Sequence, residues 1–312
     1  MRLIHLALIL LVSAFTCCFA ADIPKDFLVP SAARTSGEAV LAQIMGQPWA
    51  KELKGVSLGE VRLIRPKVPS HPVSQEAWHG RLVGPNGPIG YVLWDLEKGS
   101  LIEFAIDAKL TFDTEGAKTL QGVPALQQFP IKGEDGSVIA SGCVPTAGAS
   151  VVGYWIGHGH PQWQGNAGKD FLPEITKRLR AKMRMESIPD KDGFTDNGMT
   201  LAGAFPDELA LAIQADAREH KESFKCGLEP FSIKSLKAEI AAGRPVLLSC
   251  DVRVPNKPEL SWPHEVAGVG WAKIGDATFV GILDNFYQTQ HADTIRWIRP
   301  DAFSLLITMK PK

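Results

Sequence analysis

The chain has 312 residues, of which 45% are hydrophobic and 21% are charged, and its formal net charge at pH 7 is -1. This balance is typical of a globular protein with one large domain or two smaller ones. There is no basic block and no interleaving of aromatic with basic residues, which argues against nucleic acid as a partner.

The first twenty residues, 1–20, differ from the rest of the chain. Arg2 precedes a mostly apolar run, Leu3–Val12, and small residues follow up to Ala20. A positive start, a short apolar run and a small-residue end indicate a secretory signal peptide cleaved after Ala20. The run is too short for a membrane anchor, and a lipid anchor on Cys17 or Cys18 is the minor alternative. We therefore expect a secreted or periplasmic protein with no membrane span after signal removal.

Signal removal would leave three cysteines: Cys143, Cys226 and Cys250. An odd number in an oxidising compartment means that at least one thiol has no partner within the chain. One division pairs Cys226 with Cys250 and leaves Cys143 free. The alternative is that Cys226 and Cys250 are two buried thiols.

The stretch over residues 21–117 is expected to form a small α+β region. Ser36 is a candidate N-cap for a short helix that continues to Ile44. Further along, Tyr91–Trp94 and Leu101–Ile106 are rich in apolar and aromatic residues and flank a Gly-containing turn. This pattern predicts a β-hairpin.

A linker rich in Gly, Gln and Pro, residues 116–136, separates this region from the next. Helices are predicted from Cys143 through Trp155, over Phe171–Met185 and from Pro206 through Ala217. Strands are predicted over Val246–Val252, Glu265–Ile274, Thr278–Leu283, Thr294–Ile298 and Leu305–Met309. Because helices come first and strands second, without alternation, residues 118–312 are expected to form an α+β domain.

Cys143 stands where a loop is expected to turn into a helix, with Pro145 in the first helical turn. Backbone N–H groups at that end favour the thiolate, and with a cation nearby they can lower a thiol pKa from about 8.5 to roughly 3.5–7.5. Most cysteines at helix starts are nevertheless inert core residues. A functional assignment therefore needs a partner base.

His264 is the candidate base, since a nucleophilic cysteine needs a base that is near in the fold rather than in the sequence. It is expected to open the strand that continues to Ile274. Asp284 ends the next apolar strand, and neighbouring strands would bring its carboxylate beside the imidazole to orient it. Asn285, one residue further, could fill the same role.

A donor for an oxyanion should lie upstream of the cysteine, where it would act together with the backbone N–H of Cys143. Gln127 and Gln128 both stand there. We favour Gln128, and Gln127 is the alternative.

The order of these residues resembles the papain-like cysteine peptidases, in the branch of the bacteriocin leader peptidases that cleave after double-glycine leaders and their secreted relatives. The resemblance covers residues 123–312. It rests on Gly142-Cys143-x-Pro145-Thr146-Ala147, Tyr154-Trp155, Gly243-Arg244-Pro245-Val246, His264, Gly270-Trp271 and Leu283-Asp284. Val144 stands where that family usually has Gly, Asn285 replaces a frequent Pro, and the spacing from Gln128 to Cys143 is longer than in papain.

The resemblance implies a papain-like fold, in which a helical half packs on an antiparallel sheet half. It also implies peptide-bond hydrolysis through a Cys143–His264–Asp284 triad and a thioester acyl-enzyme, with Gln128 in the oxyanion hole. The partner would be a peptide or protein substrate, and no metal or organic cofactor is required.

Two matters stay open at this point. Residues 21–117 are either a propeptide that covers and inhibits the cleft or a permanent accessory domain. Two other functions fit the same scaffold: a deamidating or transglutaminase-like cysteine enzyme, and a catalytically inactive binding module.

Overall fold

The structure is a computed structural model that describes residues 29–65, 76–106, 112–132, 136–188, 201–254, 257–286 and 294–312. The expected signal peptide, residues 1–20, lies outside these described residues. Within them, no helix is long and apolar enough to cross a membrane.

The described residues form helices and strands in an α+β arrangement. The α-helices are α1 (Ser31–Met45), α2 (Cys143–Gly157), α3 (Phe171–Ala181), α4 (Pro206–Glu219) and α5 (Ile233–Ala241). The shorter 3-10 helices are η1 (Pro48–Leu53), η2 (Pro161–Gln164) and η3 (Pro300–Ala302). The first strands are β1 (Ser57–Ile64), β2 (Ala77–Gly84), β3 (Gly87–Asp95), β4 (Leu101–Ile106), β5 (Asp113–Thr114), β6 (Ala117–Thr119), β7 (Pro130–Lys132) and β8 (Val138–Ala140). The later strands are β9 (Glu186–Ile188), β10 (Leu201–Gly203), β11 (Phe224–Pro230), β12 (Val246–Val254), β13 (Lys257–Ile274), β14 (Ala277–Leu283), β15 (Ile295–Ile298) and β16 (Phe303–Pro311).

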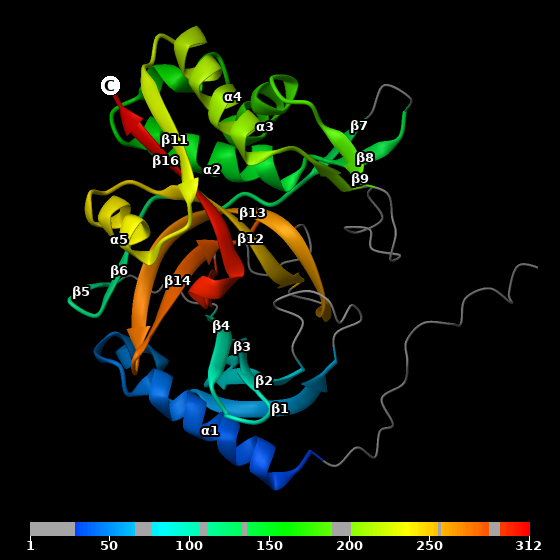
Figure 1. The fold of residues 1–312 in the computed structure, drawn as a ribbon, viewed down its shortest axis with the longest axis vertical. Helices are drawn as coiled ribbons and strands as arrows, with labels where there is room; N and C mark the ends of the chain where they lie inside the picture. Colours follow the sequence, from blue (N-terminus) through cyan, green and yellow to red (C-terminus); the bar gives the residue numbers. More distant parts are fainter. Residues whose placement is uncertain are drawn as a thin grey trace, which may run out of the picture.

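A 12-stranded sheet runs through the molecule in the order β1-β2-β3-β4-β15-β14-β13-β12-β16-β11, with β6 paired to β13 and β5 to β6. Neighbouring strands are antiparallel, as in the pairs β12–β13, β13–β14 and β15–β4. Figure 1 shows α2, α3 and α4 gathered at one end, β1–β4 with α1 at the other, and β12–β14 between them. The expected α+β class is thereby confirmed.

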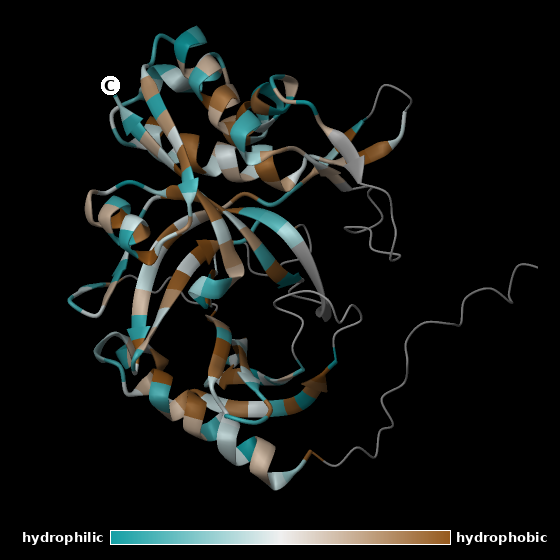
Figure 2. Cartoon of the chain, in the orientation of Figure 1, coloured by the Kyte–Doolittle hydropathy of each residue, from teal (hydrophilic) through white to brown (hydrophobic). Residues whose placement is uncertain are grey.

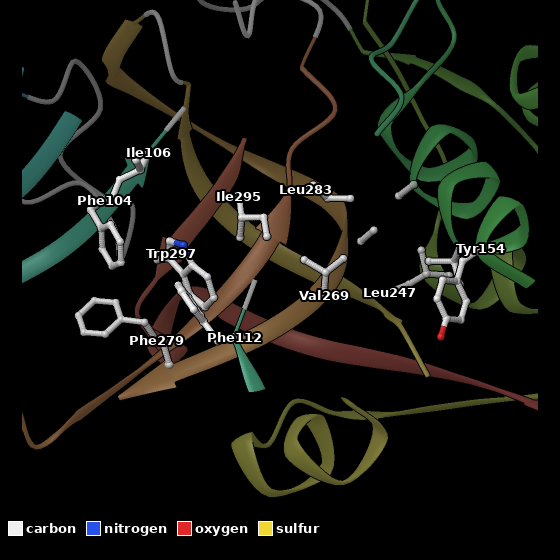
Figure 3. Close-up of a cluster of buried hydrophobic side chains, with 14 of the residues drawn as sticks. Phe104, Ile106, Phe112, Tyr154, Leu247, Val269, Phe279, Leu283, Ile295 and Trp297 are labelled. Atoms are coloured by element: carbon white, nitrogen blue, oxygen red, sulfur yellow. The ribbon is translucent and has the colours of Figure 1, made fainter. Parts of the chain in front are cut away.

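The N-terminal strands belong to the same sheet as the C-terminal ones. Strand β4 pairs with β15, which places Phe104 opposite Trp297. Their rings stack with centroids 6.0 Å apart and planes 14° apart. Figure 3 shows these two rings together with Phe112 and Phe279 in one cluster. The expected boundary between residues 117 and 118 falls inside β6, which pairs with β13.

The central parts of β12 and β13 are covered on both faces, which explains the apolar runs Val246–Leu248 and Val266–Ala272. Leu247 and Ala267 belong to the core that includes the buried side of α2, whereas Leu248 and Val266 belong to the core beside α5. Figure 2 shows hydrophobic and hydrophilic residues along both α1 and α4, as expected for helices with one packed face. Helix α2 is different, because most of its residues are buried.

Most of the elements predicted from the sequence are confirmed. The hairpin is β3 with β4, and the predicted helices are α2, α3 and α4. Helix α3 ends at Ala181 rather than Met185, and beyond it the backbone N–H of Arg184 instead bonds the Glu208 carboxylate at 3.1 Å.

Ser36 is not a helix cap, and that prediction is wrong. Helix α1 begins at Ser31, directly after Pro30, so Ser36 lies inside the helix. Its hydroxyl donates to Ala33 O at 2.9 Å and accepts from Trp94 Nε1 at 2.9 Å. The hydroxyl therefore ties α1 to β3.

His264 does not open its strand, which begins at Lys257. The reason is that β12 continues to Val254 and pairs with this extension, with Cys250 opposite His264. The backbone of His264 therefore lies within the β12–β13 strand pairing rather than at its end.

Candidate active site

The nucleophile predicted from the sequence, Cys143, is the first residue of α2 and is partly exposed. Gly142 before it has φ +92°, a conformation that L side chains rarely adopt. A Cβ at this position would lie 2.8 Å from Met185 Cε and 3.0 Å from the carbonyl oxygen of Ala202. Glycine is therefore required both by the backbone turn and by the packing around it.

Hydrogen bonds hold the turn before the cysteine. Thr146 Oγ1 donates to Gly142 O at 2.6 Å and lies 2.9 Å from Ser141 Oγ. Ser141 is paired twice with Phe129: its backbone N–H donates to Phe129 O at 2.8 Å, and its Oγ accepts from Phe129 N at 3.1 Å. This network explains the Gly-Cys-x-Pro-Thr pattern physically, since the threonine closes the turn that presents the thiol.

His264 lies between the thiol and a carboxylate. Its Nε2 is 3.2 Å from Asp284 Oδ1, and its ring stacks on Phe286 with centroids 3.9 Å apart and planes 5° apart. Burial lowers the pKa of His264, but hydrogen bonds to Asp284 and to Cys143, together with their charges, raise it to about 9. With Nε2 directed at Asp284, Nδ1 is the ring nitrogen left to bond the Cys143 sulfur. The arrangement favours the protonated form of the imidazole.

Asp284 is buried and ionised. Burial raises the pKa of its carboxyl, but the charge of Arg296 and the hydrogen bond with His264 outweigh burial and hold the pKa well below its usual range. The carboxylate also accepts from Phe286 N at 3.0 Å. Arg296 Nη1 contacts its other oxygen. Asp284 can therefore fix the orientation of the imidazole without being protonated itself.

Asn285, which the sequence left open as the alternative to Asp284 for orienting His264, contacts other groups. Its Nδ2 donates to Cys143 O at 3.1 Å and to Glu265 O at 2.9 Å. Asp284 is thus the residue in contact with His264, and Asn285 ties the start of α2 to β13.

Gln128 is buried next to this junction, whereas Gln127 is only half-buried. The backbone N–H of Gln128 donates to Asn285 O at 2.8 Å, and its Nε2 donates to Asn285 Oδ1 at 3.4 Å. A primary amide carries two N–H groups. One of these bonds Asn285, whose own amide bonds Cys143 O, so a single residue connects Gln128 to Cys143.

Cys226 and Cys250 do not form a disulfide, and all three described cysteines are free. Strand β16 lies between β11 and β12, with Cys226 opposite Met309 and Cys250 opposite Phe303. Two strand spacings of about 4.8 Å put the two cysteines beyond the roughly 7 Å that a disulfide spans between Cα atoms. Burial raises the pKa of Cys226 to about 12, so this thiol stays protonated.

Arg296 and Glu103 belong to the site, and neither was predicted from the sequence. Arg296 contacts Asp284, and its Nη2 lies 2.6 Å from Glu103 Oε1. A signal was present in the sequence, because each charge stands inside a predicted buried strand between apolar neighbours. A charge in such a place needs a partner.

Glu265 is a second buried carboxyl group at the site, and it too was not predicted from the sequence. Its Oε2 accepts from Ser249 Oγ at 2.7 Å, and its Oε1 has no hydrogen-bond partner among the described residues. Burial raises the pKa of Glu265 to about 7, against the opposing effects of the Ser249 hydrogen bond and the His264 charge. This carboxyl group therefore changes its charge near neutral pH.

The structure has a cavity of about 230 Å³ whose lining includes none of the triad residues. Its lining includes Glu103, Asp251, Arg253 and Asp301. Within the described ranges, no three His, Cys, Asp or Glu side chains are grouped so as to hold a metal ion.

Comparisons with known proteins gave no match: neither a scan against protein-family models nor a search of curated proteins found one for this chain.

Proposed function

We propose that this chain is a cysteine peptidase with a papain-like fold, in which Cys143 is the nucleophile, His264 the base and Asp284 the group that orients the base. The observation that carries this proposal is the His264 imidazole, which bonds both the Cys143 thiol and the Asp284 carboxylate. A thiol at the start of a buried helix, next to an imidazole held by a carboxylate, is the arrangement that activates a cysteine for acyl transfer. The helices beside an antiparallel sheet are compatible with this fold.

In the first half of the proposed reaction, the proton of Cys143 resides on His264, and the thiolate attacks a peptide carbonyl carbon. A C–S bond forms, and the carbonyl oxygen becomes an oxyanion. The Cys143 backbone N–H and Gln128 Nε2 would donate to that oxygen. When the C–N bond breaks, His264 gives its proton to the departing amine, and the acyl group remains on sulfur as a thioester.

In the second half, His264 takes a proton from water, and the resulting hydroxide attacks the thioester carbonyl. The C–S bond breaks, the product leaves as a carboxylic acid, and the proton on His264 restores the starting pair with the thiolate. Asp284 keeps the imidazole in the same orientation through both halves, because its bond is to the nitrogen that does not face sulfur.

The cellular setting is proposed from the sequence of the N-terminus. We propose cleavage after Ala20 and a secreted or periplasmic enzyme that acts on peptides or proteins. The free thiol of Cys143 is then the reactive group of the protein, whereas Cys226 and Cys250 remain protonated because burial raises the pKa of both thiols.

The test is incubation of the chain from Ala21 onward with a mixture of unlabelled proteins, followed by mass spectrometry of new N-termini and of acyl adducts on Cys143. Cys143→Ser is the inactive control, and Cys226→Ser is the matched control at a half-buried thiol. New N-termini that depend on Cys143 alone support the proposal. Release of ammonia without new N-termini would instead indicate a deamidating or transglutaminase-like enzyme. Neither product would indicate an inactive binding module.

A further inference from the structure

The Asp284 carboxylate contacts a series of buried polar groups that extends into the N-terminal region. Arg296 on β15 contacts Asp284 through Nη1 and Glu103 on β4 through Nε and Nη2, at 3.0 and 2.6 Å. Tyr91 on β3 donates its hydroxyl hydrogen to the same oxygen of Glu103. The side chains of Arg296, Glu103 and Asp284 are each only 3–4% exposed.

The backbone around this chain of contacts is fixed by strand pairing. Strand β4 lies beside β15 with Ala105 opposite Arg296 and Glu103 opposite Ile298. Arg296 Nη2 also donates to Arg253 O of β12 at 3.1 Å. Residues of β4 and β12, together with Asp284 after β14, thus hold the guanidinium, and β4 comes from the region that the sequence left open as a removable propeptide.

We propose that Glu103 and Arg296 are positioning residues of the active site, and that strands β3 and β4 are therefore a permanent part of the enzyme. The proposal rests on the proposed function, because it concerns the triad of that same site. It goes further by assigning a role to the N-terminal region: this region completes the electrostatic environment of His264.

The physical reason is a balance of buried charges. Asp284 attracts a proton onto His264, but the neighbouring Arg296 cation opposes that attraction. Glu103 compensates Arg296, and its charge also interacts with the buried Arg253 guanidinium of β12. Without Glu103, two cations, Arg296 and Arg253, would stand against the single carboxylate of Asp284, and the imidazolium would lose much of its stabilisation.

Other titratable groups face His264 and must be kept constant in a test. Cys143 lies on α2, Glu265 follows His264 on β13, and Cys250 lies opposite His264 on β12. Burial raises the pKa of Cys250 well above its usual value, so this thiol is neutral. Burial likewise raises the pKa of Tyr91 well above its usual value, which leaves its hydroxyl able to donate to Glu103.

The experiment is an NMR titration of the His264 ring in the chain from Ala21 onward, for wild type, Glu103→Gln and Glu103→Asp. His264→Gln identifies the signal. For Glu103→Gln we expect the pKa of His264 to fall by about one unit, because a net charge of -1 is removed a few ångströms beyond Asp284. Glu103→Asp retains the charge and should restore most of the shift.

Asp216→Asn is the matched control for a loss of stability. Asp216 is fully buried and pairs with Arg178 at 3.0 Å, in contact with helices rather than with the triad. This variant should lower the melting temperature as Glu103→Gln does and leave the pKa of His264 unchanged. An unchanged pKa in Glu103→Gln, or an equal fall in Asp216→Asn, would overturn the positioning role.

A second measurement does not depend on whether Glu103→Gln folds. Mass spectrometry of the wild-type species that iodoacetamide labels fastest at Cys143 should find residues 87–106 still attached. A fast-reacting species that begins after Ile106 would overturn the proposal. If no wild-type species reacts faster than an ordinary thiol, the result contradicts the proposed function itself. If the wild type reacts fast but lacks these strands, only this inference fails.

Discussion

Asn285 donates a hydrogen bond from Nδ2 to the carbonyl oxygen of Cys143 at 3.1 Å, across 142 positions of sequence. The same nitrogen donates to Glu265 O at 2.9 Å, and Glu265 adjoins the histidine on β13. One amide therefore fixes the beginning of α2 relative to the strand that carries His264. The distance between thiol and imidazole depends on this side chain, although it bonds neither.

Replacing Asn285 by Ala should lower the free energy of unfolding by about 2–4 kcal/mol, because two carbonyl groups lose their donor in a buried place. Urea unfolding measures this change. The control is Gln47→Ala, at an exposed amide that bonds Gln43 O at 3.0 Å, where we expect a change within about 0.5 kcal/mol. Equal effects of the two variants would contradict the role given to Asn285.

Gly142→Ala should be much more costly than Gly136→Ala. Both glycines have positive φ, +92° and +80°, so alanine carries a backbone cost of about 1–2 kcal/mol at either position. Only at Gly142 would the new Cβ also meet backbone, 3.0 Å from Ala202 O. Thermal unfolding should therefore show a larger loss for Gly142→Ala, and alkylation of Cys143 should slow only in that variant. Similar losses in both variants would argue against a tightly packed nucleophile turn.

Glu265→Gln should stabilise the protein at alkaline pH. The folded pKa of Glu265, about 7, lies above its ordinary value of 4.5, because burial disfavours the charged form. Below about pH 4.5 both folded and unfolded chains are protonated there, so the group contributes no pH dependence. As pH rises from that value through about 7, the unfolded chain is favoured, by up to about 3 kcal/mol.

Denaturant unfolding from pH 4 to 9 should accordingly show Glu265→Gln equal to wild type near about pH 4 and more stable above about pH 7. Glu38→Gln, at an exposed position of α1, serves as the control and should follow wild type throughout. A gain for Glu265→Gln that does not vary with pH would show that packing, not ionisation, is responsible.

Gln128→Ala should lower kcat for peptide hydrolysis by about 10²-fold with little change in KM, since an oxyanion donor acts on the transition state. Gln127→Ala is the matched control and should leave kcat close to wild type. A rise in KM at constant kcat would instead make Gln128 a substrate-binding residue. A large fall of kcat in Gln127→Ala would move the assignment to that neighbour.

Local patterns in the sequence predicted the elements that carry the reacting groups. The loop-to-helix change at Cys143 and the apolar run ending at Asp284 are short-range signals, and both elements are present. Strand β11 and helix α5 were missed. For α5 a signal existed, because Ser232 caps the helix by accepting from Ser235 N.

The contacts between distant segments could not be predicted in the same way. Arg296 and Glu103 are 193 positions apart, and only the pairing of β4 with β15 brings them together. The different tasks of Asp284 and Asn285 likewise depend on the fold, which brings one side chain to the His264 ring and the other to two backbone carbonyl groups. Sequence patterns alone leave such a choice between neighbouring polar residues open.

The measurement that tests the central claim most directly is the rate of iodoacetamide alkylation of Cys143 against pH, in the chain from Ala21 onward and in His264→Ala. An imidazolium beside the sulfur should keep the wild-type thiol reactive at about pH 5–6. This reactivity should be lost in His264→Ala, which should react only near the ordinary thiol pKa of about 8.5. Identical profiles rising near that value in both proteins would contradict the thiolate–imidazolium pair and, with it, the proposed peptidase.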